Sequence, residues 1–62
     1  MNTITIQILT NPTTEEMGVC FPKPFKSESA AIRKAKKEGS SLIAFQPKNF
    51  MVDEDVWYVA RP

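Results

Sequence analysis

The segment between Ser27 and Gly39 carries the start and stop signals of a single α-helix, and it divides the chain into two flanking parts. Ser27 is a favourable N-cap, because its hydroxyl can accept a hydrogen bond from a free backbone N–H of the first turn. Gly39 tolerates the left-handed conformation in which many helices end. Two prolines, at positions 22 and 24, force an extended step before the cap. The sequence therefore predicts one helix over residues 28–38.

The two sides of this helix differ in character. With about 100° between successive residues, Ala31, Ile32 and Ala35 fall on one side, and cations such as Arg33 and Lys36 fall on the other. Small side chains let a helix approach a neighbouring layer closely. We therefore expect the helix to pack across one face of a sheet, with its basic side toward solvent.

Four further segments have the composition of β-strands. Residues 3–8 alternate polar and apolar side chains, and residues 17–21 resume this extended character after an Asn-Pro break. We expect these two strands to form a hairpin. Residues 42–45 and 56–60 supply two more strands after the helix. The expected fold is α+β in the order β-β-α-β-β: a small antiparallel sheet of three to four strands with one helix packed on one face.

The length of the chain allows one small domain, residues 1–62, with little apolar surface to stabilise it. A chain of this size buries only about 60% of its unfolded surface. The one cysteine, Cys20, cannot form an intramolecular disulfide, and the absence of histidine excludes the common zinc sites. No apolar run approaches the roughly 18 residues of a membrane span, and a free thiol suits a reducing compartment. We expect a cytoplasmic protein with no membrane partner.

Positive charge is concentrated in the middle of the chain. Between Lys23 and Lys37, six of the eight cations and one acid, Glu28, give a charge of +5, while each flank carries −2 and the whole chain +1. A concentrated basic face attracts phosphate or an acidic protein surface. We favour the alternative, a solvated outer helix face, because a helix packed on a sheet must turn polar groups outward. The candidate residues for binding phosphate or an acidic surface are Lys26, Arg33, Lys34, Lys36 and Lys37.

Several large apolar residues near the C-terminus are candidates for contact with a protein partner. Three of them are consecutive in an expected loop and would form an interaction patch if exposed. We favour their burial, because so small a domain needs its apolar groups in the core. Two more are adjacent in the last strand and so point to opposite faces, one of them toward a sheet face that we expect to be open. The candidate partner-binding residues are Phe50, Met51 and Val52 in the loop and Trp57 and Tyr58 in the strand.

Residues suited to catalysis or metal binding are few. The absence of histidine excludes every Ser-His and Cys-His nucleophile arrangement. Cys20 has no obvious activating base nearby in the sequence, so we expect it to pack as a small apolar residue. Residues 53–55 are three consecutive acids that lack the glycine and the spacing of a calcium loop, so we expect a solvated turn. We expect no enzymatic activity, no cofactor and no metal.

These observations leave three hypotheses about function. The first is a non-enzymatic protein-interaction module, such as an accessory or inhibitor protein that binds a larger protein partner. Short chains that begin with Met1 and lack enzyme motifs are common among phage and mobile-element accessory genes, and we expect a complete gene product of this kind. The alternative is a nucleic-acid-binding protein that places its basic helix, residues 28–38, on phosphates, although the low net charge counts against it. The third is a homo-oligomer, favoured by marginal size and an open sheet face or edge.

Overall fold

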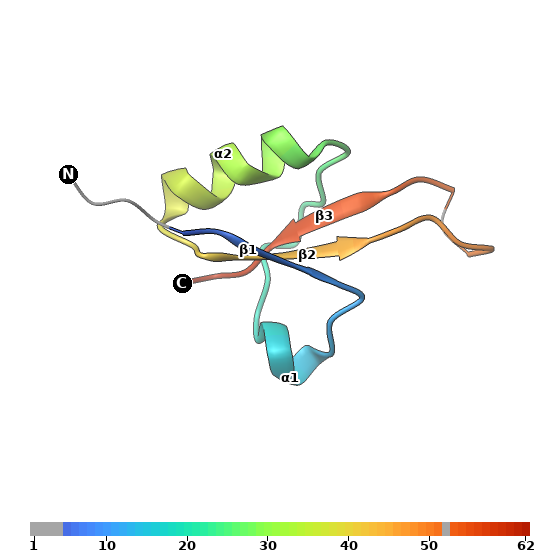
Figure 1. Ribbon diagram of the computed structural model, residues 1–62, viewed down its shortest axis with the longest axis horizontal. Coiled ribbons are helices and arrows are strands. Elements are labelled where there is room, and N and C mark those ends of the chain that lie inside the picture. Colours follow the sequence, from blue (N-terminus) through green and yellow to red (C-terminus); the bar gives the residue numbers. More distant parts are fainter. Residues whose placement is uncertain (1–4, 52) are drawn as a thin grey trace.

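The computed structural model describes residues 5–51 and 53–62 and shows a three-stranded mixed sheet with a helix on each face (Figure 1). In chain order the elements are β1 (Gln7–Thr10), α1 (Thr14–Met17), α2 (Glu28–Glu38), β2 (Leu42–Gln46) and β3 (Val56–Val59). The strands lie in the order β1-β2-β3, with β1 parallel and β3 antiparallel to the central strand β2. Among the described residues, no helix has the length and apolar character needed to cross a membrane. The expected α+β class is confirmed.

The helix α2 has the bounds that the sequence predicts. Ser27 Oγ accepts a hydrogen bond from the N–H of Ala30 at 3.2 Å, which caps the first turn. Gly39 ends the helix with a φ of 75°, and its N–H bonds the carbonyls of Ala35 and Lys36. A Cβ at Gly39 would meet no neighbouring atom, so the left-handed backbone, and not a lack of space, favours glycine there.

The core on the α2 side is centred on four residues with no exposed surface. Ala31 and Ala35 come from α2, Ile43 from β2 and Val59 from β3. Because the alanines extend no further than Cβ, the helix backbone lies close to the sheet. Larger, partly buried side chains pack around this centre, namely Ile6, Ile8, Phe21, Phe25, Ile32 and Trp57. This arrangement confirms the expected apolar side of α2.

The strand β1 pairs with β2 and not with the segment that follows it, so the expected first hairpin is wrong. Gln7 lies opposite Leu42 in a parallel register, which requires a long crossover between the two strands. Asn11 turns the chain with a positive φ of 49°. Thr13 then begins α1 with a capping box, in which its hydroxyl and the carboxylate of Glu16 each accept a hydrogen bond from the other residue's N–H. A short helix therefore stands where the hairpin loop was expected.

Of residues 17–21, expected as the second strand, Met17 ends α1, and residues 19–21 lie beside β3 and the residues that follow it. Cys20 forms a single antiparallel bridge with Ala60, and the N–H of Phe21 bonds the carbonyl of Val59 at 2.8 Å. Alternating side chains identify an extended segment but not its neighbour, which explains the error. The four strands and the β-β-α-β-β order are therefore not confirmed, and the observed order is β-α-α-β-β.

The sheet face opposite α2 is partly covered by α1, and not open as expected (Figure 1). Met17 of α1 is buried with Ala44 of β2 and with Ala60. Tyr58 packs against this second cluster, whereas Trp57 packs against the core under α2. The prediction that these two aromatic residues lie on opposite faces is confirmed.

Between β2 and β3 the described residues 47–51 and 53–55 form a projecting loop, which we call the arm (Figure 1). Phe50 is 96% exposed and Met51 79% exposed, so their expected burial is wrong. The arm extends past the N-terminal end of α2, beyond the part of the sheet that this helix covers (Figure 1). Val52, the third member of this predicted patch, lies outside the described residues.

A substitution of Ala35 by leucine tests the close approach of α2 to the sheet. We expect Ala35→Leu to lower the free energy of unfolding by about 1–3 kcal/mol, because the added atoms overfill a site with no exposed surface. The same change at exposed Ser29 of α2, Ser29→Leu, should alter stability by less than about 0.5 kcal/mol. Urea unfolding of both variants measures the difference, and equal effects would contradict the packing described.

Candidate functional site

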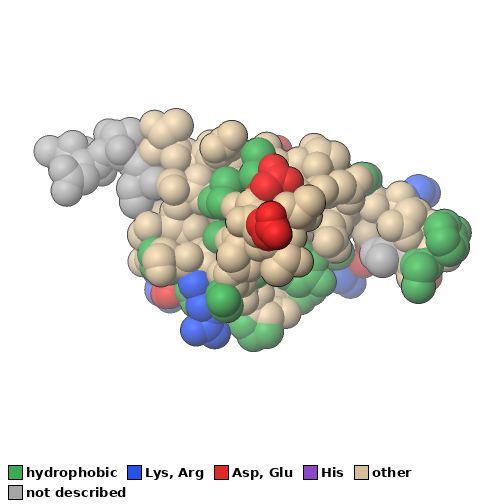
Figure 2. Space-filling model, turned by 90° about the horizontal axis from the view of Figure 1, so that it is seen from below, with side chains coloured by type: hydrophobic (Ala, Val, Ile, Leu, Met, Phe, Trp, Pro, Cys, Tyr) green, Lys and Arg blue, Asp and Glu red, His purple; other side chains and the backbone are tan. Residues whose placement is uncertain are grey.

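The arm tip, which we define as Phe50 and Met51, is the most exposed apolar feature of the described chain. The side chain of Asn49 accepts a hydrogen bond from the N–H of Met51 at 2.8 Å, which forms a local turn. Further down the arm, Asp55 Oδ1 accepts a hydrogen bond from the N–H of Lys48 at 2.7 Å and ties the two sides together. Figure 2 shows hydrophobic side chains at the end of the molecule that the arm forms, on the right of the view. The arm is thus a braced loop that presents two large apolar side chains to solvent.

Aromatic packing holds the root of the arm, which is the part of β2 and β3 from which the arm projects. Trp57 and Phe45 lie opposite each other in the β2–β3 ladder, with ring centroids 4.9 Å apart and planes inclined by 30°. Trp57 also exchanges two backbone hydrogen bonds with Phe25, of 2.8 and 2.9 Å. Of the predicted partner-binding residues, Phe50 and Met51 lie at the tip. Trp57 packs under α2, and Tyr58 packs on the other face of the sheet.

The five candidate cations do not form one continuous surface. Arg33, Lys36 and Lys37 are exposed on α2. Lys34 is half-buried, and its Nζ lies 3.7 Å from Glu38 Oε2 and 4.9 Å from the centroid of a phenyl ring, that of Phe21. Lys26, before the helix, has its Nζ 3.2 Å from Glu54 Oε2 on the arm. An exposed pair of this kind adds little stability, but it places one acid of the arm beside a cation that precedes α2.

A second feature, which we call the aromatic hollow, lies beside α2 and has a volume of about 400 Å³. Its lining combines two phenylalanines, two lysines and a proline, namely Phe21, Pro22, Lys23, Phe25 and Lys34. The guanidinium carbon of Arg61 lies 5.1 Å from the centroid of Phe21 and adds a further cation beside the same ring. This feature was not predicted from the sequence. Only part of its lining carried a local signal, because positions 21, 23 and 25 share one side of an extended segment.

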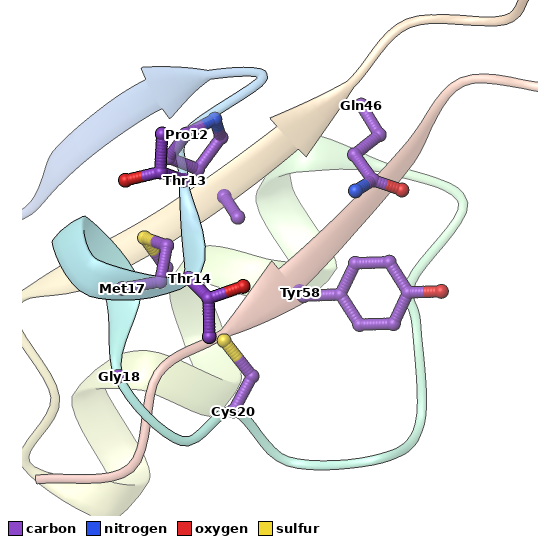
Figure 3. A pocket seen from close by; sticks show the side chains of 9 residues that line it. Pro12, Thr13, Thr14, Met17, Gly18, Cys20, Gln46 and Tyr58 are labelled. Atoms are coloured by element: carbon purple, nitrogen blue, oxygen red, sulfur yellow. The ribbon is translucent and has the colours of Figure 1, made fainter.

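A third feature, the thiol hollow, lies beside α1 on the other sheet face and has a volume of about 240 Å³ (Figure 3). Figure 3 shows Cys20 with its sulfur directed toward Thr14 of α1, while Tyr58 and Gln46 border the hollow from the strands. Burial raises the pKa of the Cys20 thiol, because a thiolate loses hydration there. The thiol is therefore held in its unreactive protonated form near neutral pH.

The part of the chain that the structure describes contains no group of three or more cysteines, aspartates, glutamates and histidines placed to hold a metal ion. Asp53, Glu54 and Asp55 are all exposed, which confirms the prediction of a solvated acidic turn. The chemistry that this surface offers is therefore apolar contact at the arm tip and charge contact at the exposed acids and cations.

Comparison of the chain with protein-family models, with curated proteins and with solved structures found no match.

Alkylation of the single thiol tests the environment of Cys20. At pH 7 we expect iodoacetamide to modify the folded protein more slowly than the protein unfolded in urea, because burial both shields the sulfur and raises its pKa. Raising the pH should narrow this difference as the folded thiol ionises. Mass spectrometry follows the reaction, and faster alkylation of the folded state would show an activated cysteine instead.

Proposed function

We propose that this protein is a non-enzymatic protein-interaction module that binds a larger protein through the arm tip. The observation that carries the proposal is the exposure of Phe50 and Met51, 96% and 79%, on a loop that projects from the body. Burying one such side chain is worth about 1.5–3 kcal/mol. A 62-residue chain leaves both outside its core, although its stability depends on few buried groups. This supports a role for the two residues in contact with another molecule.

The construction of the arm also suits docking. The hydrogen bonds of Met51 to Asn49 and of Lys48 to Asp55 restrict the loop before any partner arrives. Restriction in advance lowers the entropy lost on binding. A phenyl ring and a flexible thioether side by side can fill an apolar pocket of irregular shape.

The charges near the tip favour a protein over a nucleic acid as the partner. Asp53, Glu54 and Asp55 are exposed on the same loop and would repel phosphate. An apolar pocket with basic groups on its rim would be complementary to this surface. Binding there would let the protein act as an adaptor or inhibitor of the larger partner.

Replacement of the two tip residues tests this proposal. With the protein as bait in a lysate of its natural host, we expect Phe50→Ser combined with Met51→Ser to weaken capture of a stoichiometric protein partner by roughly 30-fold, as for a binding hot spot of about 2 kcal/mol. Val19→Ser is the matched control, because Val19 is 69% exposed but lies outside the arm. Capture that is unchanged in the tip variant would contradict the proposal.

The alternative is a nucleic-acid-binding protein, and the exposed trio Arg33, Lys36 and Lys37 on α2 is the feature that favours it. Under that alternative, replacing all three residues by glutamine would abolish binding to single- or double-stranded oligonucleotides and would remove its steep salt dependence. Under our proposal, the same variant keeps its protein partner. Fluorescence anisotropy should then detect no oligonucleotide binding by the wild-type protein at physiological salt. Lys48→Gln, a neutralisation outside α2, controls for net charge.

A further inference from the structure

The arm tip and the aromatic hollow have complementary chemistry and lie on different parts of the molecule. The hollow is lined by Phe21 and Phe25 together with Lys23 and Lys34, and the Lys34 ammonium lies 4.9 Å from the centroid of the Phe21 ring. The arm offers two apolar side chains followed by three acids, residues 53–55. An aromatic-walled site with a basic rim fits an apolar residue that is followed by carboxylates.

The tip cannot enter the hollow of its own molecule. Glu54 on the arm bonds Lys26 beside the root, and Trp57 at the end of the arm is bridged to Phe25. The arm therefore begins next to the segment that lines the hollow, and it projects away from the body (Figure 1). Only a tip from another molecule can reach the site.

We infer that a second copy of this chain is an occupant of the aromatic hollow, with the arm tip of one molecule inserted between Phe21 and Phe25 of the next. This inference rests on the proposed role of the tip as a docking element. The hollow, at about 400 Å³, lies within the size range of pockets that enclose a small ligand. Phe50 would lie against the rings, and the Met51 sulfur gains favourable contact with an aromatic edge. The arm acids would then lie near Lys23 and Arg61, whose charges are opposite.

The two surfaces that meet are different, so two copies can exchange tips reciprocally or associate head-to-tail. Reciprocal exchange closes at a symmetric dimer. Head-to-tail contact leaves one tip and one hollow free after each addition and produces a closed ring or a growing chain. Association of this kind depends on protein concentration and on salt, because both apolar and ionic groups contribute.

Two variants separate the two surfaces. The tip variant carries Phe50→Ser and Met51→Ser and keeps the hollow. The hollow variant carries Lys23→Glu and Lys34→Met and keeps the tip, and neither change removes a fully buried side chain. Arg33→Glu is the control for the charge reversal at Lys23, because Arg33 is an exposed cation of α2 that does not line the hollow. Thermal unfolding monitored by circular dichroism confirms that each variant is folded.

Sedimentation equilibrium over a concentration series provides the readout. We expect the wild type and Arg33→Glu to associate, and each of the two other variants to associate at least roughly 10-fold more weakly. An equimolar mixture of the tip variant and the hollow variant should form a 1:1 complex and nothing larger, because only one competent tip and one competent hollow remain.

Three results would overturn the inference. The wild type could remain monomeric at about 1 mM, both variants could associate as strongly as the wild type, or the mixture could fail to form a complex. A different result would contradict the proposed function, namely host-protein capture that is unchanged by Phe50→Ser combined with Met51→Ser. A monomeric wild type that still captures a host protein through Phe50 and Met51 would overturn self-docking alone.

Discussion

The contact between the alanine side of α2 and the strands β2 and β3 is the interaction on which the rest of the structure depends. Ala31, Ala35, Ile43 and Val59 have no exposed surface, and the larger apolar side chains on this side pack around them. A chain of 62 residues has no disulfide to support it and buries only about 60% of its unfolded surface. Close packing at this layer, the larger of the two buried clusters, therefore contributes much of the stability of the fold. The same contact fixes the crossover that makes β1 parallel to β2.

The arm is a consequence of where this layer ends. The β2–β3 ladder continues to the pair Gln46 and Val56, beyond the region that α2 covers, and the loop that follows has no second layer above it. Packing of Phe45 on Trp57 anchors the root of the arm. The core is therefore complete without the tip, and Phe50 and Met51 take no part in its packing.

The charged side chains are also divided between α2 and the arm. The exposed cations of α2 lie on the solvent side of the buried layer, while Lys34 turns toward Phe21 and Glu38. The acids of the arm lie at its surface, and one of them, Glu54, bonds Lys26 in the body. The arm and the solvent side of α2 consequently carry opposite net charge.

The candidate site could be predicted only in part from the sequence. Consecutive large apolar residues marked Phe50 and Met51 as candidates, but the expectation that a small core would absorb them was wrong. Sequence spacing cannot report how far a sheet extends past its covering helix. The aromatic hollow was missed for a related reason, because Lys34 joins Phe21 and Phe25 only after α2 packs beside their segment.

Local interactions explain what the sequence by itself determined. The bounds of α2, its apolar and basic sides, the solvated acidic turn and the opposite orientations of Trp57 and Tyr58 depend on residues within a few positions of one another. The tertiary structure decided which strands are neighbours. Gln7 pairs with Leu42 and Cys20 with Ala60, and these pairs join residues far apart in the chain. Their choice depends on the total apolar area that the sheet and α2 bury together, which no short segment of the sequence contains.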